Sequence, residues 1–126
     1  MIRNTAGAFL LAATLGALAL TPVTDVHAGT VFDGPWSVIV YTSKGPCDPS
    51  YRFSGQITNG QISYAYGSLV VTGQVDQSGL TYVHVTAASA HGEARGRMTA
   101  SHGSGTWSGE GPDGRCAGTW VAMRPG

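Results

Sequence analysis

The chain has 126 residues, of which 42% are hydrophobic and 11% charged, and its seven acidic and seven basic side chains balance. This length allows a single domain. A net charge near zero gives the protein no electrostatic reason to seek nucleic acid or an anionic membrane surface, so we expect no nucleic-acid partner.

The first 28 residues have the pattern of a secretory signal peptide. A short basic start at Arg3 precedes the apolar run Ala8–Leu20, and Val26-His27-Ala28 fits the cleavage rule for small residues. The run counts 13 residues, whereas a membrane-spanning helix needs roughly 20. We expect cleavage near Ala28, no membrane span afterwards, and a secreted or periplasmic location. An uncleaved signal anchor is the alternative.

The remaining 98 residues, 29–126, form one predicted domain and contain both cysteines, Cys47 and Cys116. Two cysteines in an oxidising compartment predict a disulfide. The bridge would close a loop of 70 residues, for which chain entropy gives about 4 kcal/mol. Two free thiols or a metal pair are the alternatives, but no further ligands follow at zinc-type spacing.

Residues of β preference alternate with polar ones throughout the predicted domain, and no stretch has a sustained helical period. Asn59-Gly60 is the strongest short hairpin signal. Glycine and proline clusters separate the other segments. The pattern predicts eight strands, at Trp36–Thr42, Tyr51–Thr58, Gln61–Tyr66, Leu69–Val75, Leu80–Ala87, Glu93–Ala100, Ser104–Ser108 and Arg115–Met123.

Every connection between these segments is short, which favours antiparallel neighbours, and closing the sheet removes its two exposed edges. An antiparallel register that places Trp36 opposite Arg124 also places Val38 opposite Ala122. The same register sets Val40 opposite Trp120, and the cysteines lie just beyond the end of this ladder. We therefore predict an all-β fold, an eight-stranded antiparallel up-and-down barrel closed by its first and last strands. A sandwich of two sheets is the alternative.

Gly34-Pro35-Trp36 at the start of the first strand and Arg124 at the end of the last resemble the lipocalin and avidin group of β-barrels. The resemblance implies that Trp36 packs against Arg124 and closes the barrel floor. The register given above places Trp120 in the same seam. A terminal helix, the long lipocalin lid loop and the biotin-holding pattern of avidins are missing, so the resemblance implies a barrel and no particular ligand.

A second resemblance is to small periplasmic inhibitors of metalloproteases, which are also exported barrels with one disulfide, although their bridge closes a short loop. A protruding arm at residues 29–33 would favour that role.

Catalytic motifs are missing from the sequence. There is no Gly-x-Ser-x-Gly elbow and no His-Glu-x-x-His, and the acidic residues stand singly in turns. A zinc or haem site using His84 with His91 or His102 is conceivable, but the spacing fits no known ligand set, and the latter two lie in predicted loops. We expect no enzyme activity, no metal and no cofactor.

Two groups of side chains are candidates for binding. Tyr82, His84, Arg95 and Arg97 lie opposite the apolar faces of their strands and so point outward, either as a binding surface or as an ordinary solvated face. Tyr64 and Tyr66 either line an interior cavity or pack in the core.

The sequence thus predicts an exported, monomeric, non-catalytic barrel that binds a small apolar molecule or an exported protein. An inhibitor of an exported protease and a structural envelope protein without a ligand are the alternatives. A cavity of about 300 Å³ would favour the ligand carrier.

Overall fold

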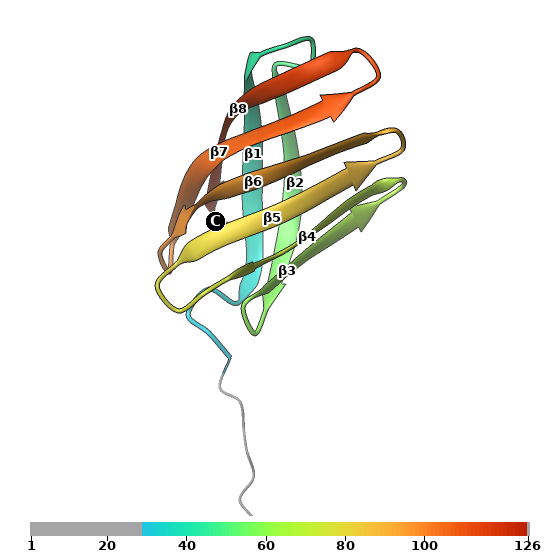
Figure 1. The fold of residues 1–126 in the computed structure, drawn as a ribbon. Coiled ribbons are helices and arrows are strands. Elements are labelled where there is room, and N and C mark those ends of the chain that lie inside the picture. The colour runs from blue at the N-terminus through green and yellow to red at the C-terminus, as the bar shows by residue number, and fades with distance from the viewer. Residues whose placement is uncertain (1–28, 126) are drawn as a thin grey trace, which may run out of the picture.

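The computed structural model describes residues 29–125; the predicted signal peptide, residues 1–28, lies outside the described residues. In the described range, eight antiparallel strands follow one another around a closed barrel (Figure 1). The predicted all-β meander is therefore confirmed. The strands are β1 (Gly34–Lys44), β2 (Ser50–Thr58), β3 (Gln61–Tyr66), β4 (Leu69–Val75), β5 (Leu80–Ala87), β6 (Ala90–Met98), β7 (His102–Gly111) and β8 (Gly114–Met123).

The seam between β1 and β8 has the predicted register. Val38 pairs with Ala122 and Val40 with Trp120, and a bulge between Thr42 and Lys44 shifts the ladder at its far end. The Cys47–Cys116 disulfide is formed next to that end, as predicted. β8 is thus joined to β1 by backbone pairing and to the β1–β2 loop by a covalent bond, in an architecture compatible with the lipocalin and avidin barrels.

Two strands in the second half begin two or three residues earlier than predicted. β6 begins at Ala90, so His91 lies on a strand and not in a loop, because Ala88 takes a positive φ of 47° and closes a tight turn after β5. β7 begins at His102, which the sequence placed in a turn. Strand propensity does not predict the full length of β7, because glycine alternates along it and glycine is depleted in strands.

Glycines and tryptophans of β7 and β8 occupy reciprocal positions. Gly105 pairs with Trp120 and Trp107 pairs with Gly118, so each indole lies over a glycine of the opposite strand. The two Gly-Thr-Trp triplets of the sequence, at 105–107 and 118–120, therefore pair with each other in antiparallel orientation. The arrangement gives two large rings room on the inner surface of a strongly curved wall.

The core lies at one end of the barrel, which we call the floor. The segment before β1 crosses this end, and Phe32 within it is only 5% exposed. The turns at the floor join β2 to β3, β4 to β5 and β6 to β7, so the other four connections lie at the opposite end, the mouth. The buried cluster at the floor comprises Phe32, Trp36, Ile57, Val75, Met98, Trp120 and Ala122.

The wall is incomplete between β2 and β3. Their pairing runs from Thr58 with Gln61 to Gln56 with Ser63 and stops there. Both strands nevertheless continue toward the mouth, to Ser50 and Tyr66, and diverge as they do so (Figure 1). We call this gap the notch; the neighbouring ladders, β1 with β2 and β3 with β4, continue past it.

Candidate functional site

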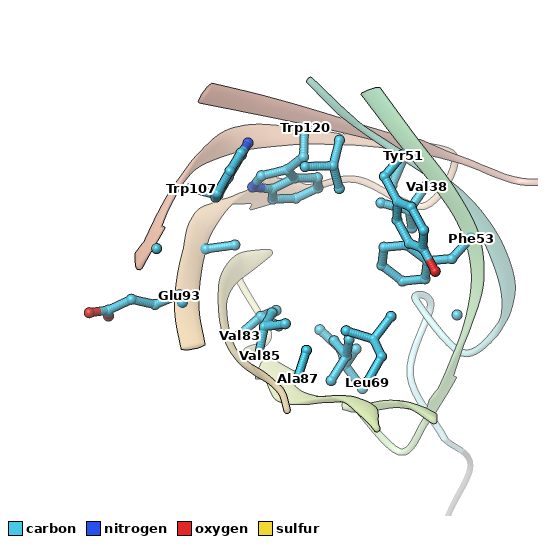
Figure 2. A pocket seen from close by; sticks show the side chains of 18 of the residues that line it. Val38, Tyr51, Phe53, Leu69, Val83, Val85, Ala87, Glu93, Trp107 and Trp120 are labelled. Atoms are coloured by element: carbon cyan, nitrogen blue, oxygen red, sulfur yellow. The ribbon is translucent and has the colours of Figure 1, made fainter. Parts of the chain in front are cut away.

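An apolar cavity of about 290 Å³ occupies the barrel above the floor. Figure 2 shows the side chains that point into it from strands all around the barrel, whereas Glu93 points away. Inward positions of alternating strands supply these side chains, because successive residues of a strand face opposite sides of the sheet. The cavity-lining side chains include Val38, Phe53, Leu69, Val83, Val85 and Trp107.

Three polar groups of the cavity wall, on Trp107, Trp120 and Thr81, are already hydrogen-bonded within the protein. Trp107 Nε1 donates to the carbonyl oxygen of Tyr41 at 2.8 Å, and Trp120 Nε1 donates to that of Arg95 at 3.2 Å. The hydroxyl of Thr81, the buried polar residue of the wall, donates to the carbonyl oxygen of Gly79 at 3.0 Å. The wall therefore offers apolar contact to an occupant, and these groups are not free to bond to it.

Charged residues occur at the mouth. Glu110 lies 3.5 Å from Arg115 Nε and 3.8 Å from His91 Nε2, and all three side chains are substantially exposed. These residues stand at the ends of β6, β7 and β8 nearest the mouth. The arrangement places an ion pair, with a histidine next to it, beside the opening.

The floor is closed by the chain end and by the segment before β1. The guanidinium carbon of Arg124 lies 4.3 Å from the centre of the Trp36 ring. Trp36 Nε1 donates to the carbonyl oxygen of Phe32 at 2.7 Å, which holds residues 30–33 against the floor. The N-terminal segment in the described range therefore packs beneath the barrel and does not protrude as an inhibitory arm would.

Asp33 anchors the same segment to the β2–β3 turn. Its carboxylate accepts hydrogen bonds from Asn59 N at 2.8 Å and Gly60 N at 3.1 Å, and from the Thr30 hydroxyl. The Thr30 hydroxyl, together with these backbone amides, lowers the pKa of Asp33 to about 2. The floor is thus held by a carboxylate at one side and by a guanidinium at the other.

Tyr64 and Tyr66 do not line the cavity. Tyr64 packs against Phe53, with ring centres 4.9 Å apart, and Tyr66 is 73% exposed. Both stand at the end of β3 where the pairing with β2 has already stopped, so they border the notch. Burial, and then the neighbouring Tyr51, raise the pKa of Tyr64. Tyr51 and Phe53 line the cavity from the facing strand instead.

The structure brings three of the four predicted surface residues together on the outer face. The Tyr82 hydroxyl donates to Glu93 at 2.8 Å and lies 3.1 Å from His84 Nε2, while Arg95 lies over the Tyr82 ring at 5.1 Å. The bond from Tyr82 lowers the pKa of Glu93 and raises that of the tyrosine. Arg97 stands apart and donates to the carbonyl oxygen of Ser78 at 3.1 Å.

Comparison with protein-family models, with curated proteins and with solved structures gives no match. Across residues 29–125 the structure contains no helix of the length and hydropathy that a bilayer span requires. Within the same range, no three histidine, cysteine, aspartate or glutamate side chains gather closely enough to hold a metal ion.

Sequence reasoning missed several residues of the site. The sequence assigns Phe32 no role in the core, although an apolar residue four positions before a strand tryptophan is a usable signal. Phe53 and Tyr51 were recognised as strand residues without a role in the cavity. Nothing in the sequence indicates that the backbone pairing between β2 and β3 ends partway along the strands, because each has ordinary strand composition.

Proposed function

We propose that the protein is a non-catalytic carrier of a small apolar molecule, which it holds inside the barrel. The observation that carries this proposal is the apolar cavity of about 290 Å³, at the lower end of the range for ligand pockets. Protein interiors are normally close-packed, and a hollow core costs stability, so a cavity of this size in a small domain calls for a function.

The arrangement of rigid and open parts supports the same proposal. The floor is densely packed and tied by Arg124 and Asp33, while the mouth is bordered by loops and the disulfide. A closed floor prevents an apolar molecule from passing through the barrel. A barrel that is closed at the floor and open at the mouth is suited to hold a ligand and not to serve as a channel for it.

The location belongs to the proposal as well. A disulfide is typical of proteins in the periplasm or outside the cell, and the Cys47–Cys116 bridge fits that location. We propose that residues 1–28 direct export. We propose further that the domain works as a monomer related to the lipocalin and avidin barrels, and that it captures its ligand in that compartment.

Calorimetric titration of the purified, oxidised protein with 2-naphthol, a compact neutral aromatic, tests the proposal. We expect saturable binding of one molecule per chain. Native mass spectrometry of the protein purified from its own host then identifies the natural occupant as a mass difference that organic solvent removes. A protein that takes up no 2-naphthol and carries no small molecule would contradict the proposal.

A matched pair of variants shows whether binding occurs in the cavity. Val85→Trp adds a large ring to an inward position of β5, whereas Val70→Trp adds the same ring to an exposed position of the adjacent β4. We expect the inward variant to lose at least ten-fold in affinity and the outward variant to bind like the natural protein. Equal binding by both variants would place the ligand elsewhere.

A further inference from the structure

We infer that the ligand is a compact, uncharged molecule of roughly ten to twelve non-hydrogen atoms whose single polar group, where it has one, lies at the mouth. This inference rests on the proposed function and specifies the chemical class that the cavity accepts. Three observations carry it: the cavity volume, the bonding of the polar wall atoms, and the balance of charge around the mouth.

The volume limits the size of the ligand. A cavity of about 290 Å³ holds the liquid volume of roughly ten water-sized groups, and slightly more when a ligand extends into the opening. The cavity cannot extend into the floor, because Trp36 is only 2% exposed and its indole N–H is hydrogen-bonded to the carbonyl oxygen of Phe32. Long acyl chains and polycyclic molecules of twenty or more atoms therefore exceed the space available.

The interior excludes polar and charged groups of the ligand. The indole N–H groups of Trp107 and Trp120 and the hydroxyl of Thr81 all donate to backbone carbonyl oxygens. A hydroxyl or amide pushed to the bottom of the cavity would lose its water and gain no partner from these groups, which is unfavourable. The part of the ligand that enters must therefore be hydrocarbon.

The mouth provides no excess of positive charge to hold a carboxylate. Its cationic residues are Lys44, Arg115 and Arg52, the third residue of β2, and the acidic residues Asp48, Glu110 and Asp113 stand on the same loops and strand ends. Arg115 already lies 3.5 Å from Glu110, which His91 also approaches. A neutral hydroxyl or carbonyl at this position can bond to exposed polar groups and to water without confronting like charge.

The size limit is tested by calorimetry with a series of straight-chain primary alcohols from 1-hexanol to 1-tetradecanol. Each added methylene that enters the cavity should raise the affinity about four-fold, from the usual burial energy of a methylene group. We expect this rise to stop near 1-decanol, where the cavity is full. Affinity that keeps rising at the same rate to 1-tetradecanol would overturn the size limit and leave the proposed function standing.

The preference for an uncharged ligand is tested at constant chain length with 1-octanol, octanoate and octylammonium at pH 7.5. We expect both ions to bind at least ten-fold more weakly than the alcohol. Binding of either ion as tight as that of 1-octanol would overturn this part of the inference.

Val85→Trp and Val70→Trp serve as controls in both series, and the first should abolish the dependence on chain length. If no alcohol binds, the inference and the proposed function fall together.

Discussion

Arg124 and Trp36 lie at opposite ends of the described fold in sequence and in direct contact in space, with the guanidinium carbon 4.3 Å from the centre of the indole ring. The same guanidinium donates to the carbonyl oxygens of Asp33 at 2.7 Å, Val31 at 2.8 Å and Ala100 at 3.0 Å. One side chain therefore joins the chain end, the segment before β1 and the β6–β7 turn.

Removal of this contact should weaken the whole barrel. We expect Arg124→Ala to lower the free energy of unfolding by about 2–4 kcal/mol, because it removes a cation–π contact and charged hydrogen bonds together. Arg124→Lys should recover only part of the loss, since an ammonium lacks the planar fork. Urea denaturation measures both. Arg97→Ala, which removes one surface hydrogen bond, is the control, and equal losses at the two positions would contradict the assignment.

The disulfide should contribute to stability through the size of the loop that it closes. The two cysteines are 69 positions apart, so the bridge removes about 4 kcal/mol of chain entropy from the unfolded state. We expect dithiothreitol to lower the melting temperature by more than about 10 °C. The double variant Cys47→Ser with Cys116→Ser should melt at the reduced protein's temperature with or without the reductant. Identical melting of oxidised and reduced protein would refute this expectation.

Low pH should destabilise the fold by protonating Asp33, whose carboxylate holds the segment before β1 at the floor. Its pKa in the folded protein is about 2, below the ordinary value of 3.8, so the charged carboxylate stabilises the fold. This contribution is complete above pH 4 and is lost as the pH falls toward 2. We expect the urea midpoints of the natural protein and of Asp33→Asn to differ most at pH 5 and to converge near pH 2. A difference that is independent of pH would assign the effect to something other than this titration.

The reciprocal tryptophan and glycine pairs leave no room for a side chain at either Gly105 or Gly118. A Cβ at Gly118 would overlap the carbonyl oxygen of Tyr41 and approach Trp107 Nε1 to 2.9 Å. We expect Gly118→Ala to cost about 1–3 kcal/mol or prevent folding. Gly111→Ala is the matched control, since its Cβ would meet only Ala90 at 3.5 Å, and thermal melting should scarcely change. Comparable losses in the two variants would show that close approach at Gly118 is not decisive.

The notch should be visible in amide hydrogen exchange. Odd-numbered residues of β2 bond to β1 and even-numbered residues of β3 bond to β4, so Ser54 and Ala65 direct their amides toward the notch. We expect these two amides to exchange much faster than those of Gln56 and Ser63, where the strands still pair. Nuclear magnetic resonance resolves the four amides separately. Equal protection at all four would mean that the strands pair along their full length.

Much of the fold could be predicted because local and long-range signals agree. The alternation from Trp36 to Val40 and from Trp120 to Ala122 determines both the faces and the register of the seam. The turn at Asn59-Gly60 is marked by residues that tolerate a positive φ. The turn at Ala88 has no such mark, because alanine rarely takes this conformation, and so the start of β6 was misplaced.

The candidate site was less predictable because a cavity depends on sums of side-chain volumes from many strands. Inward positions of β6 and β7 near the mouth carry glycine and alanine, and only the closed geometry shows that no facing residue fills the space they leave. Tyr64 has the alternation of a lining residue, yet the divergence of β2 from β3 turns it toward Phe53 at the notch. The alternation of residues in the sequence predicts which face of the sheet a side chain is on, but it does not predict how far apart two neighbouring strands lie.

The incomplete ladder between β2 and β3 also bears on the association of copies of this protein with one another. Unpaired backbone groups attract other extended chains, and natural sheets discourage that association by placing charge beside them. Arg52 is the single ionic side chain of β2, it is exposed, and β3 has none. We therefore expect the colloidal solubility of the protein at high concentration to depend on Arg52, which stands beside the unpaired part of the ladder.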